Sequence, residues 1–202
     1  MNRIQKIFQD RTEKVIPFLT AGYPSKKDTA QMVLAAEKSG AAMVELGMPF
    51  SDPLADGPII QAASQKAIEN GVNISWILEV VTEIRRESEI PLALMGYINP
   101  IINYGIGKFI HDCKLAGVDG LIIPDLPPEE AAELLQLAND AEICIILLVA
   151  PNTGNERIRE ISKLAGSLIY CVAILGITGE AGANRGELQQ YLKRVEENSE
   201  CP

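Results

Sequence analysis

The chain has 202 residues, with 18 basic and 27 acidic side chains and a formal net charge of −9 at pH 7. This acidic balance argues against a nucleic-acid partner, because proteins that bind nucleic acid present basic surfaces to phosphate. Apolar residues make up 47% of the chain and charged residues 22%, which excludes disordered and fibrous proteins. The longest uninterrupted apolar stretch, residues 143–150, is far shorter than the ~20 residues of a membrane helix, so no membrane span is expected.

The N-terminus predicts a short amphipathic helix rather than a secretory signal. Ile4, Ile7 and Phe8 recur at helical spacing among charged residues, without an apolar core segment or a small-residue cleavage site. The cysteines are separated by 31, 27 and 30 residues, a pattern unlike a metal knuckle or a disulfide framework. We therefore expect reduced core cysteines in a cytoplasmic protein.

Six short apolar runs recur along the chain and predict six β-strands. They are nearly continuous in hydrophobicity, as expected of parallel strands that are covered on both faces. The intervening segments show apolar residues three and four positions apart, which predicts helices. Gly40, Gly117 and Gly166 follow three of these segments, where a left-handed C-cap would end a helix. The predicted strands cover residues 15–20, 42–46, 91–95, 120–124, 144–150 and 167–173, and the clearest helices cover residues 28–39, 74–86 and 129–141.

The repeated strand–helix order fits two folds, the doubly wound open sheet and the eight-stranded barrel, in which chemistry lies beyond the carboxyl ends of the strands. No G-x-G-x-x-G follows the first strand and no Walker A lysine loop is present, which favours the barrel. Six units average about 34 residues each, so eight would need about 270. The sequence predicts a single α/β domain over residues 1–202, a (β/α)₈ TIM barrel with about six of its eight units.

One predicted strand end contains an isolated carboxylate. Glu45 lies in the sequence VELG, within an otherwise apolar run. Burial raises the pKa of a carboxyl group and can make it a general acid or base near neutral pH. A structural glutamate paired with a lysine across the barrel is the alternative, and the sequence leaves both interpretations open.

The loop that follows, residues 48–58, is unusually long for a connection between a strand and a helix. Long loops at this position tend to be functional. It contains Asp56, followed by Gly57 and Pro58 ahead of a helical pattern, so a helix N-cap is the alternative role of Asp56. Asp52, next to Pro53, is a candidate that could equally be a turn residue.

The segment VELGMPFSDPLADGPIIQAA resembles the signature of the tryptophan synthase alpha chain family. The resemblance continues in order through PFLTAGYP, LMGYINPI, AGVDGLIIPDLPPEE, LVAPNT and GITG, and covers essentially the whole chain. It implies a (β/α)₈ barrel that cleaves indole-3-glycerol phosphate to indole and glyceraldehyde 3-phosphate. This is a retro-aldol reaction for which the alpha chain needs no metal and no cofactor of its own.

The resemblance also assigns roles to individual residues. Glu45 and Asp56 match the two catalytic acids of the family. Indole C3 must gain a proton, the ring N–H must be stabilised as positive charge develops, and the glycerol hydroxyl must lose its proton, which two carboxyl groups in different environments can accomplish. We expect Glu45 to shuttle the proton between the hydroxyl and C3, and Asp56 to hold the indole N–H. The expected substrate-binding residues are Phe18, Tyr97, Tyr170, Thr178 and Gly179.

Each substrate-binding assignment has a structural alternative. Phe18, Tyr97 and Tyr170 would line the indole pocket, although an aromatic residue on a barrel strand is often part of the core. Thr178 and Gly179 would belong to a loop that closes over the site, with the Thr178 hydroxyl bonded to Asp56, but Thr178 could be an ordinary turn residue.

The resemblance further implies a partner, the beta chain of an alpha2beta2 complex, whose pyridoxal phosphate does not belong to the alpha chain. We expect contact at residues 53–56, Pro100 and Asp125; a structural role for Asp125 is the alternative. A docking and regulatory subunit with little catalysis of its own is the alternative function.

The sequence departs from the family pattern in two places. After Tyr170 the chain reads CVAIL, where the family has a serine with polar neighbours. The chain also ends where the seventh strand of the family would begin, so the phosphate-binding loops after strands seven and eight are not expected in it. We therefore expect an alpha chain that is shortened at its C-terminus.

Overall fold

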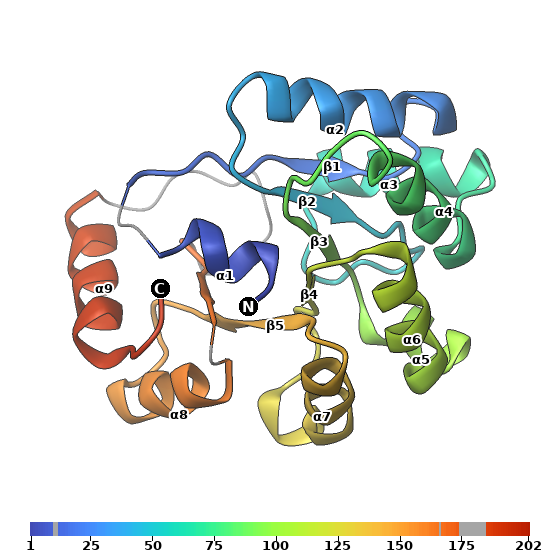
Figure 1. Ribbon diagram of the computed structural model, residues 1–202. Coiled ribbons are helices and arrows are strands. Elements are labelled where there is room, and N and C mark those ends of the chain that lie inside the picture. Colours follow the sequence, from blue (N-terminus) through green and yellow to red (C-terminus); the bar gives the residue numbers. More distant parts are fainter. Residues whose placement is uncertain (10–11, 166, 174–184) are drawn as a thin grey trace.

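The computed structural model describes residues 1–9, 12–165, 167–173 and 185–202. Its six strands are parallel and follow one another in the order β1-β2-β3-β4-β5-β6, with at least one helix in every connection. Helices stand around the outside of the curved sheet, while the short N-terminal helix α1 lies on its inner side (Figure 1). Each strand overlaps its predicted run and is shorter than it, so the predicted order of elements is confirmed.

The strands are β1 (Phe18–Thr20), β2 (Val44–Gly47), β3 (Leu92–Met95), β4 (Gly120–Ile122), β5 (Cys144–Val149) and β6 (Ile169–Cys171). The α-helices are α1 (Arg3–Ile7), α2 (Thr29–Lys38), α3 (Pro58–Glu69), α4 (Ile74–Ile84), α5 (Ile98–Tyr104), α6 (Ile106–Ala116), α7 (Ala132–Asp140), α8 (Asn155–Ala165) and α9 (Arg185–Asn198). Two single turns of 3₁₀ helix, η1 (Lys26–Asp28) and η2 (Pro128–Glu130), precede α2 and α7.

The helix ends largely follow the sequence signals. Asn73 caps α4 by accepting a hydrogen bond from the backbone N–H of Trp76 at 2.9 Å. Gly40 and Gly117 follow α2 and α6 with positive φ angles of 92° and 88°, as predicted, whereas Gly166 lies outside the described residues. Within the described part of the chain, no helix has both the length and the apolar character needed to cross a membrane.

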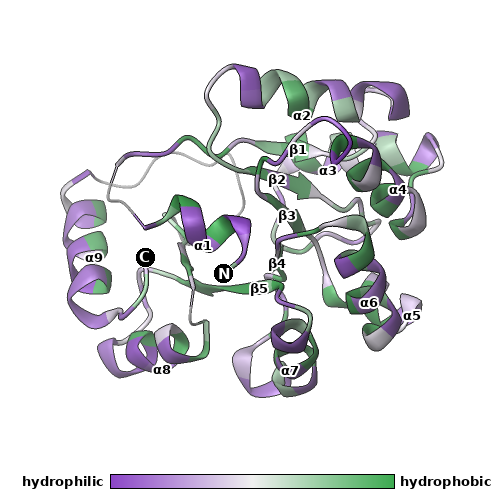
Figure 2. Ribbon diagram, in the orientation of Figure 1, coloured by the Kyte–Doolittle hydropathy of each residue, from purple (hydrophilic) through white to green (hydrophobic). Residues whose placement is uncertain are grey.

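The strands separate two apolar clusters. Val44 and Leu46 pack in the larger cluster with the outer helices, whereas Met43 belongs to a second cluster on the inner face. Successive side chains of a strand point to opposite faces, so Glu45 shares the inner face with Met43. In Figure 2 the strands are mostly green, while the helices carry both green and purple, as expected of helices with one buried face.

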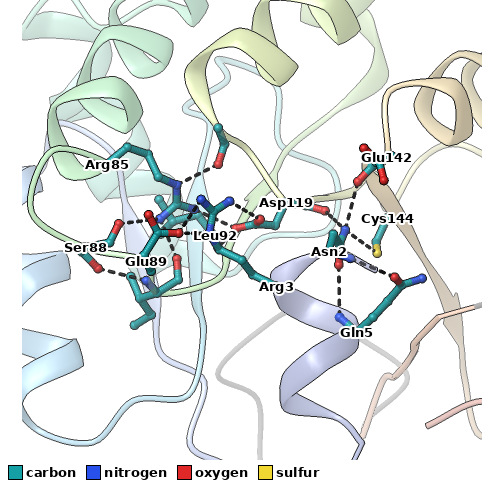
Figure 3. A network of polar contacts seen from close by, with 12 residues as sticks. Asn2, Arg3, Gln5, Arg85, Ser88, Glu89, Leu92, Asp119, Glu142 and Cys144 are labelled. Atoms are coloured by element: carbon teal, nitrogen blue, oxygen red, sulfur yellow. Dashed lines mark hydrogen bonds and ion pairs between the residues drawn. The ribbon is translucent and has the colours of Figure 1, made fainter.

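Helix α1 closes the inner face at the amino-terminal side of the strands (Figure 3). Its Ile4 is fully buried in the inner cluster. The Asn2 side chain donates to the backbone carbonyls of Asp119, at 2.9 Å, and Glu142, at 3.1 Å, just before β4 and β5. The predicted amphipathic helix is confirmed, and its position leaves the carboxyl ends of the strands as the open side of the sheet.

The four cysteines are free thiols. Cys113 and Cys144 are buried, as expected of core cysteines. Cys171 and Cys201 are only partly buried, so the expectation of four core cysteines is too broad.

Candidate active site

Glu45 is a buried carboxyl group on the inner face of β2. It lies between Phe18 of β1 and Ala93 of β3 in the strand register, and only 8% of its surface is exposed. Desolvation by this burial raises the pKa of Glu45 to about 7. Among the described residues no basic side chain forms an ion pair with Glu45, so the lysine-paired alternative is not observed there.

Tyr170 shares a cleft with Glu45. The cleft has a volume of about 390 Å³ and is lined mainly by apolar side chains of the inner face, with Lys14 at its wall. Burial raises the pKa of Tyr170, and the charge of Glu45 raises it further. The structure therefore brings together two of the residues predicted from the sequence.

Asp56 lies in the loop between β2 and α3, but it does not cap the helix. Gly57 is the N-cap of α3 and Pro58 occupies the first turn, so the N-cap alternative for Asp56 is wrong. Its carboxylate instead lies close enough to the Tyr97 hydroxyl for that group to act on its pKa. Burial raises the pKa of Asp56, and the Tyr97 hydroxyl opposes this rise by stabilising the carboxylate.

Tyr97 joins the loop to the end of β3. It precedes α5 directly, and only 5% of its surface is exposed. Its hydroxyl oxygen accepts a hydrogen bond from the backbone N–H of Ala55 at 2.9 Å, and its ring lies 5.5 Å from that of Phe50. The pKa of Tyr97 is raised to about 12, chiefly by desolvation, so the hydroxyl remains a hydrogen-bond donor at neutral pH.

Asp56, Tyr97 and Phe18 line a second, smaller cavity at the carboxyl ends of β1 to β3. Phe18 packs over Gly47, where a Cβ atom would clash with the phenyl ring. Phe18 is also the register partner of Glu45, so a wall residue of the smaller cavity lies beside a wall residue of the larger cleft. Thr178 and Gly179 lie outside the described residues.

The sequence analysis missed two hydroxyl groups in the smaller cavity. Thr20 at the end of β1 is 9% exposed and Ser64 on α3 is 5% exposed, and both line the cavity beside Asp56. The position of Ser64 between Ala63 and Ala67 on the buried face of a helix was the only available signal.

Asp125 has the structural role that the sequence analysis considered. Its carboxylate accepts a hydrogen bond at 3.0 Å from the backbone N–H of Ile98, the first residue of α5. A carboxylate at this helix N-terminus also interacts favourably with the helix dipole. The loops after β2, β3 and β4 are thus connected by side-chain hydrogen bonds through Tyr97 and Asp125.

The described residues contain no group of three or more His, Cys, Asp and Glu side chains that could hold a metal ion. The chemically distinctive groups of the carboxyl-end face are therefore two carboxyl groups in different surroundings. Glu45 is surrounded mainly by apolar side chains, whereas the pKa of Asp56 is lowered by a neighbouring phenol, which opposes the effect of burial.

The family model described as tryptophan synthase alpha chain matches residues 4–202. The chain belongs to the tryptophan synthase alpha chain family. The tryptophan synthase alpha chain of Petrotoga mobilis is 46% identical over 202 residues, which are 100% of this chain and 78% of that protein. The alpha chain of Caldanaerobacter subterraneus subsp. tengcongensis is also 46% identical, over 206 residues, with the same two shares of 100% and 78%.

Solved structures of alpha chains have the same fold. Tryptophan synthase subunit alpha from Legionella pneumophila str. Paris superposes with a TM-score of 0.92 at 35% identity, covering 100% of this chain and 76% of that one. A structure of the tryptophan synthase a2b2 complex from Pyrococcus furiosus superposes with a TM-score of 0.85 at 37% identity, covering 93% of this chain and 75% of that one. The prediction of an α/β fold of the TIM-barrel family with six strand–helix units is confirmed.

Proposed function

We propose that this chain cleaves indole-3-glycerol phosphate to indole and glyceraldehyde 3-phosphate, with Glu45 and Asp56 as its catalytic residues. Cleavage of this substrate is the reaction of the tryptophan synthase alpha chain family. The observation that carries the assignment is the environment of Glu45, which is buried without a basic partner among the described residues and has a pKa of about 7. A carboxyl group with such a pKa exists in both protonation states near neutral pH, as a proton shuttle requires.

The proton transfers balance with Glu45 alone. Its protonated form donates to indole C3, which leaves a positive charge on the ring nitrogen. The resulting carboxylate then removes the proton from the hydroxyl group on the carbon attached to C3. As the aldehyde forms, the bond between C3 and this carbon breaks, and its electron pair restores the neutral indole ring. Glu45 ends the cycle protonated, as it began.

Asp56 is suited to the indole nitrogen. A carboxylate can accept a hydrogen bond from the ring N–H and stabilise the positive charge that develops there. The Tyr97 hydroxyl opposes the effect of burial and favours the charged form of Asp56. The different surroundings thus divide the roles, with one carboxyl group that exchanges protons and one whose charged form is favoured by a neighbouring hydroxyl.

The aromatic side chains supply the surface for the indole ring. Phe18 is a wall residue of the Asp56 cavity, Tyr170 is a wall residue of the Glu45 cleft, and Phe18 is the register partner of Glu45. We place the planar indole ring against Phe18 and Tyr170, outside the smaller cavity itself. We assign Phe18, Tyr97 and Tyr170 to this pocket, and Thr178 and Gly179 to its closure on the basis of the family resemblance.

A beta chain is the expected partner, because similar solved structures include the a2b2 complex of Pyrococcus furiosus. Large apolar side chains are exposed beside the site, namely Leu54 at 84% and Ile59 at 78% around the loop after β2, and Ile102 at 56% on α5. Such exposed apolar side chains are typical of protein–protein contact surfaces. In this assignment pyridoxal phosphate belongs to the beta chain, and the complex is cytoplasmic.

Release of indole from indole-3-glycerol phosphate tests the catalytic proposal. We expect Glu45→Gln to lower the rate at least a hundredfold, the usual contribution of an acid–base residue. We also expect Asp56→Asn to lower it strongly. Glu133→Gln, at an exposed position of α7, is the matched control and should retain the parental rate. Absence of indole release by the parent chain, or a Glu45→Gln rate above a hundredth of the parental one, would contradict the proposal.

A catalytically weak docking subunit remains the competing function, but the family comparison does not favour it. Co-purification with a tryptophan synthase beta chain tests the partner separately from catalysis. Leu54→Ser should weaken the complex, while Leu115→Ser, at a leucine on α6 that is also largely exposed, should not. Equal binding by both variants would place the contact surface elsewhere.

A further inference from the structure

The cavity beside Asp56 contains two buried hydroxyl groups that the proposed mechanism does not use. Thr20 and Ser64 are 9% and 5% exposed, and both line this cavity. Neither hydroxyl has a hydrogen-bond partner among the described residues. Every completely enclosed side-chain polar atom in this part of the chain has a hydrogen-bond partner, so the two hydroxyl oxygens are not completely enclosed. Both hydroxyl groups therefore face the cavity with unused hydrogen-bonding capacity. Because a buried hydroxyl without a partner costs free energy, we expect a partner within the cavity.

The size and lining of the cavity fit one water molecule. The space open to a water molecule is about 20 Å³. A single ordered water needs about 10–15 Å³ of such space and two to four polar partners. Thr20, Ser64 and Asp56 all line the cavity and can provide three polar partners, whereas the Tyr97 hydroxyl already accepts a hydrogen bond from Ala55. Apolar occupants of this volume would leave the hydroxyls unsatisfied.

We propose that Thr20 and Ser64 hold one ordered water molecule against the Asp56 carboxylate, and that they are positioning residues for this carboxylate. The water donates one hydrogen bond to Asp56 and completes the hydrogen bonds of the two hydroxyls. The water and the Tyr97 hydroxyl, which follows β3, then act on the carboxylate together. The site belongs to the wall formed by β1 and α3, two elements that are in contact with each other.

The water has a consequence for the charge of Asp56, and its value for catalysis rests on the proposed function. A hydrogen bond to a carboxylate stabilises the charged form, as the Tyr97 hydroxyl already does. Tyr97 is the titratable side chain that contacts Asp56 among the described residues, and Asp125 acts on Tyr97 from the loop after β4. Two hydrogen bonds together oppose the desolvation that favours the neutral acid.

Two variants without the hydroxyls test the proposal in the absence of substrate. Thr20→Val preserves shape and Ser64→Ala suits a helix, so both should fold. A high-resolution crystal structure of the parent should show a water peak within hydrogen-bond distance of both hydroxyls. This peak should be absent from both variants and present in Thr20→Ser.

In a ¹³C NMR titration of the Asp56 carboxyl carbon, the pKa should rise in Thr20→Val and Ser64→Ala and return toward the parental value in Thr20→Ser.

Thr29→Val is the matched control. Thr29 is also a buried threonine, 2% exposed, but its hydroxyl accepts a hydrogen bond from the Gly22 backbone N–H at 2.9 Å. Its loss should lower stability without changing the pKa of Asp56.

The proposal is overturned by a parental cavity without a water peak, or by an unchanged pKa of Asp56 in both hydroxyl variants. If Thr20→Val does not fold, Ser64→Ala alone decides. Because no substrate is present, these outcomes are independent of whether the chain releases indole.

Discussion

The backbone N–H of Ala55 donates a hydrogen bond to the hydroxyl of Tyr97 at 2.9 Å, although the two residues are 42 positions apart. The same hydroxyl acts on the pKa of the carboxyl group of the next residue, Asp56. One phenol therefore holds the backbone of the loop and influences the charge of the proposed catalytic residue that the loop carries. Tyr97 adds this role to the pocket-lining role expected from the sequence.

Replacement of Tyr97 by phenylalanine should release the loop while keeping the ring. We expect the pKa of Asp56 to rise, because the carboxylate loses the neighbouring hydroxyl that lowers its pKa. Loss of the bond to Ala55 should lower the free energy of unfolding by about 0.5–1.5 kcal/mol. ¹³C NMR titration measures the pKa and urea denaturation measures the stability. Tyr104→Phe, which removes a hydroxyl bonded to Asp112 at 2.7 Å, is the control. An equal rise of the Asp56 pKa in both variants would contradict the specific role of Tyr97.

The sequence located the strands and Glu45 because each leaves a local signal. An apolar run marks a strand covered on both faces, and Glu45 interrupts such a run. The orientation of Glu45 toward the inner face follows from the alternation of Met43, Val44 and Leu46 between the two clusters. The absence of a lysine partner among the described residues could not be read from the sequence, because it depends on strand register and on distant segments.

The pairing of Asp56 with Tyr97 illustrates the opposite case. Gly57 and Pro58 made an N-cap role for Asp56 equally reasonable, since the local sequence fits a helix start. Only the structure distinguishes the two roles of Asp56, because Tyr97, which acts on its carboxyl group, belongs to a different strand–helix unit. Asp119 shows the same limit, as its basic partners Arg3 and Arg85 are 116 and 34 positions away. Contacts between units arise from the closure of the sheet, which local patterns do not encode.

Stability should depend on pH through Glu45. Its pKa is raised from 4.5 to about 7 on folding, so the folded state binds more protons than the unfolded state between these values. Stability therefore falls as the pH rises through this window, by roughly 3 kcal/mol if Glu45 alone is counted. Glu45→Gln should be more stable than the parent at pH 8, and this advantage should shrink toward pH 5. Urea denaturation at both pH values measures this advantage, with Glu133→Gln as the control. A stability difference between Glu45→Gln and the parent that is the same at both pH values would contradict the prediction.

Asp119 is the centre of a buried ionic network at the opposite end of the sheet (Figure 3). Only 3% of its side chain is exposed, and it forms ion pairs with Arg3 at 3.0 Å and Arg85 at 2.7 Å. It also accepts a hydrogen bond from the backbone N–H of Leu92 at 2.9 Å. Asp119→Asn leaves the buried Arg85 without its counter-charge, so we expect a loss of about 3–5 kcal/mol in the free energy of unfolding.

An exposed ion pair provides the comparison for this network. Asp112 pairs with Lys108 at 2.6 Å, but the side chain of Lys108 is 61% exposed. Asp112→Asn should therefore cost less than about 1 kcal/mol in the same urea measurement. Similar losses in the two variants would show that burial does not set the strength of the Asp119 network.

Glu142 should be a site where stability can be gained. It follows α7 with φ of 60°, the only positive φ of a non-glycine residue in the described chain. At the same position after α2 the chain has Gly40, and the positive φ after α6 is that of Gly117. A side chain in the left-handed region costs about 1–2 kcal/mol, part of which is offset because glycine is more flexible in the unfolded state. The Glu142 side chain is exposed, and the Asn2 side chain donates a hydrogen bond to the backbone carbonyl of Glu142, which glycine retains.

We expect Glu142→Gly to raise the free energy of unfolding by about 0.5–1 kcal/mol, measured by urea denaturation. Ala141→Gly, one residue earlier at φ of −86°, should instead lower it by a similar amount, and stabilisation by both substitutions would refute the conformational explanation.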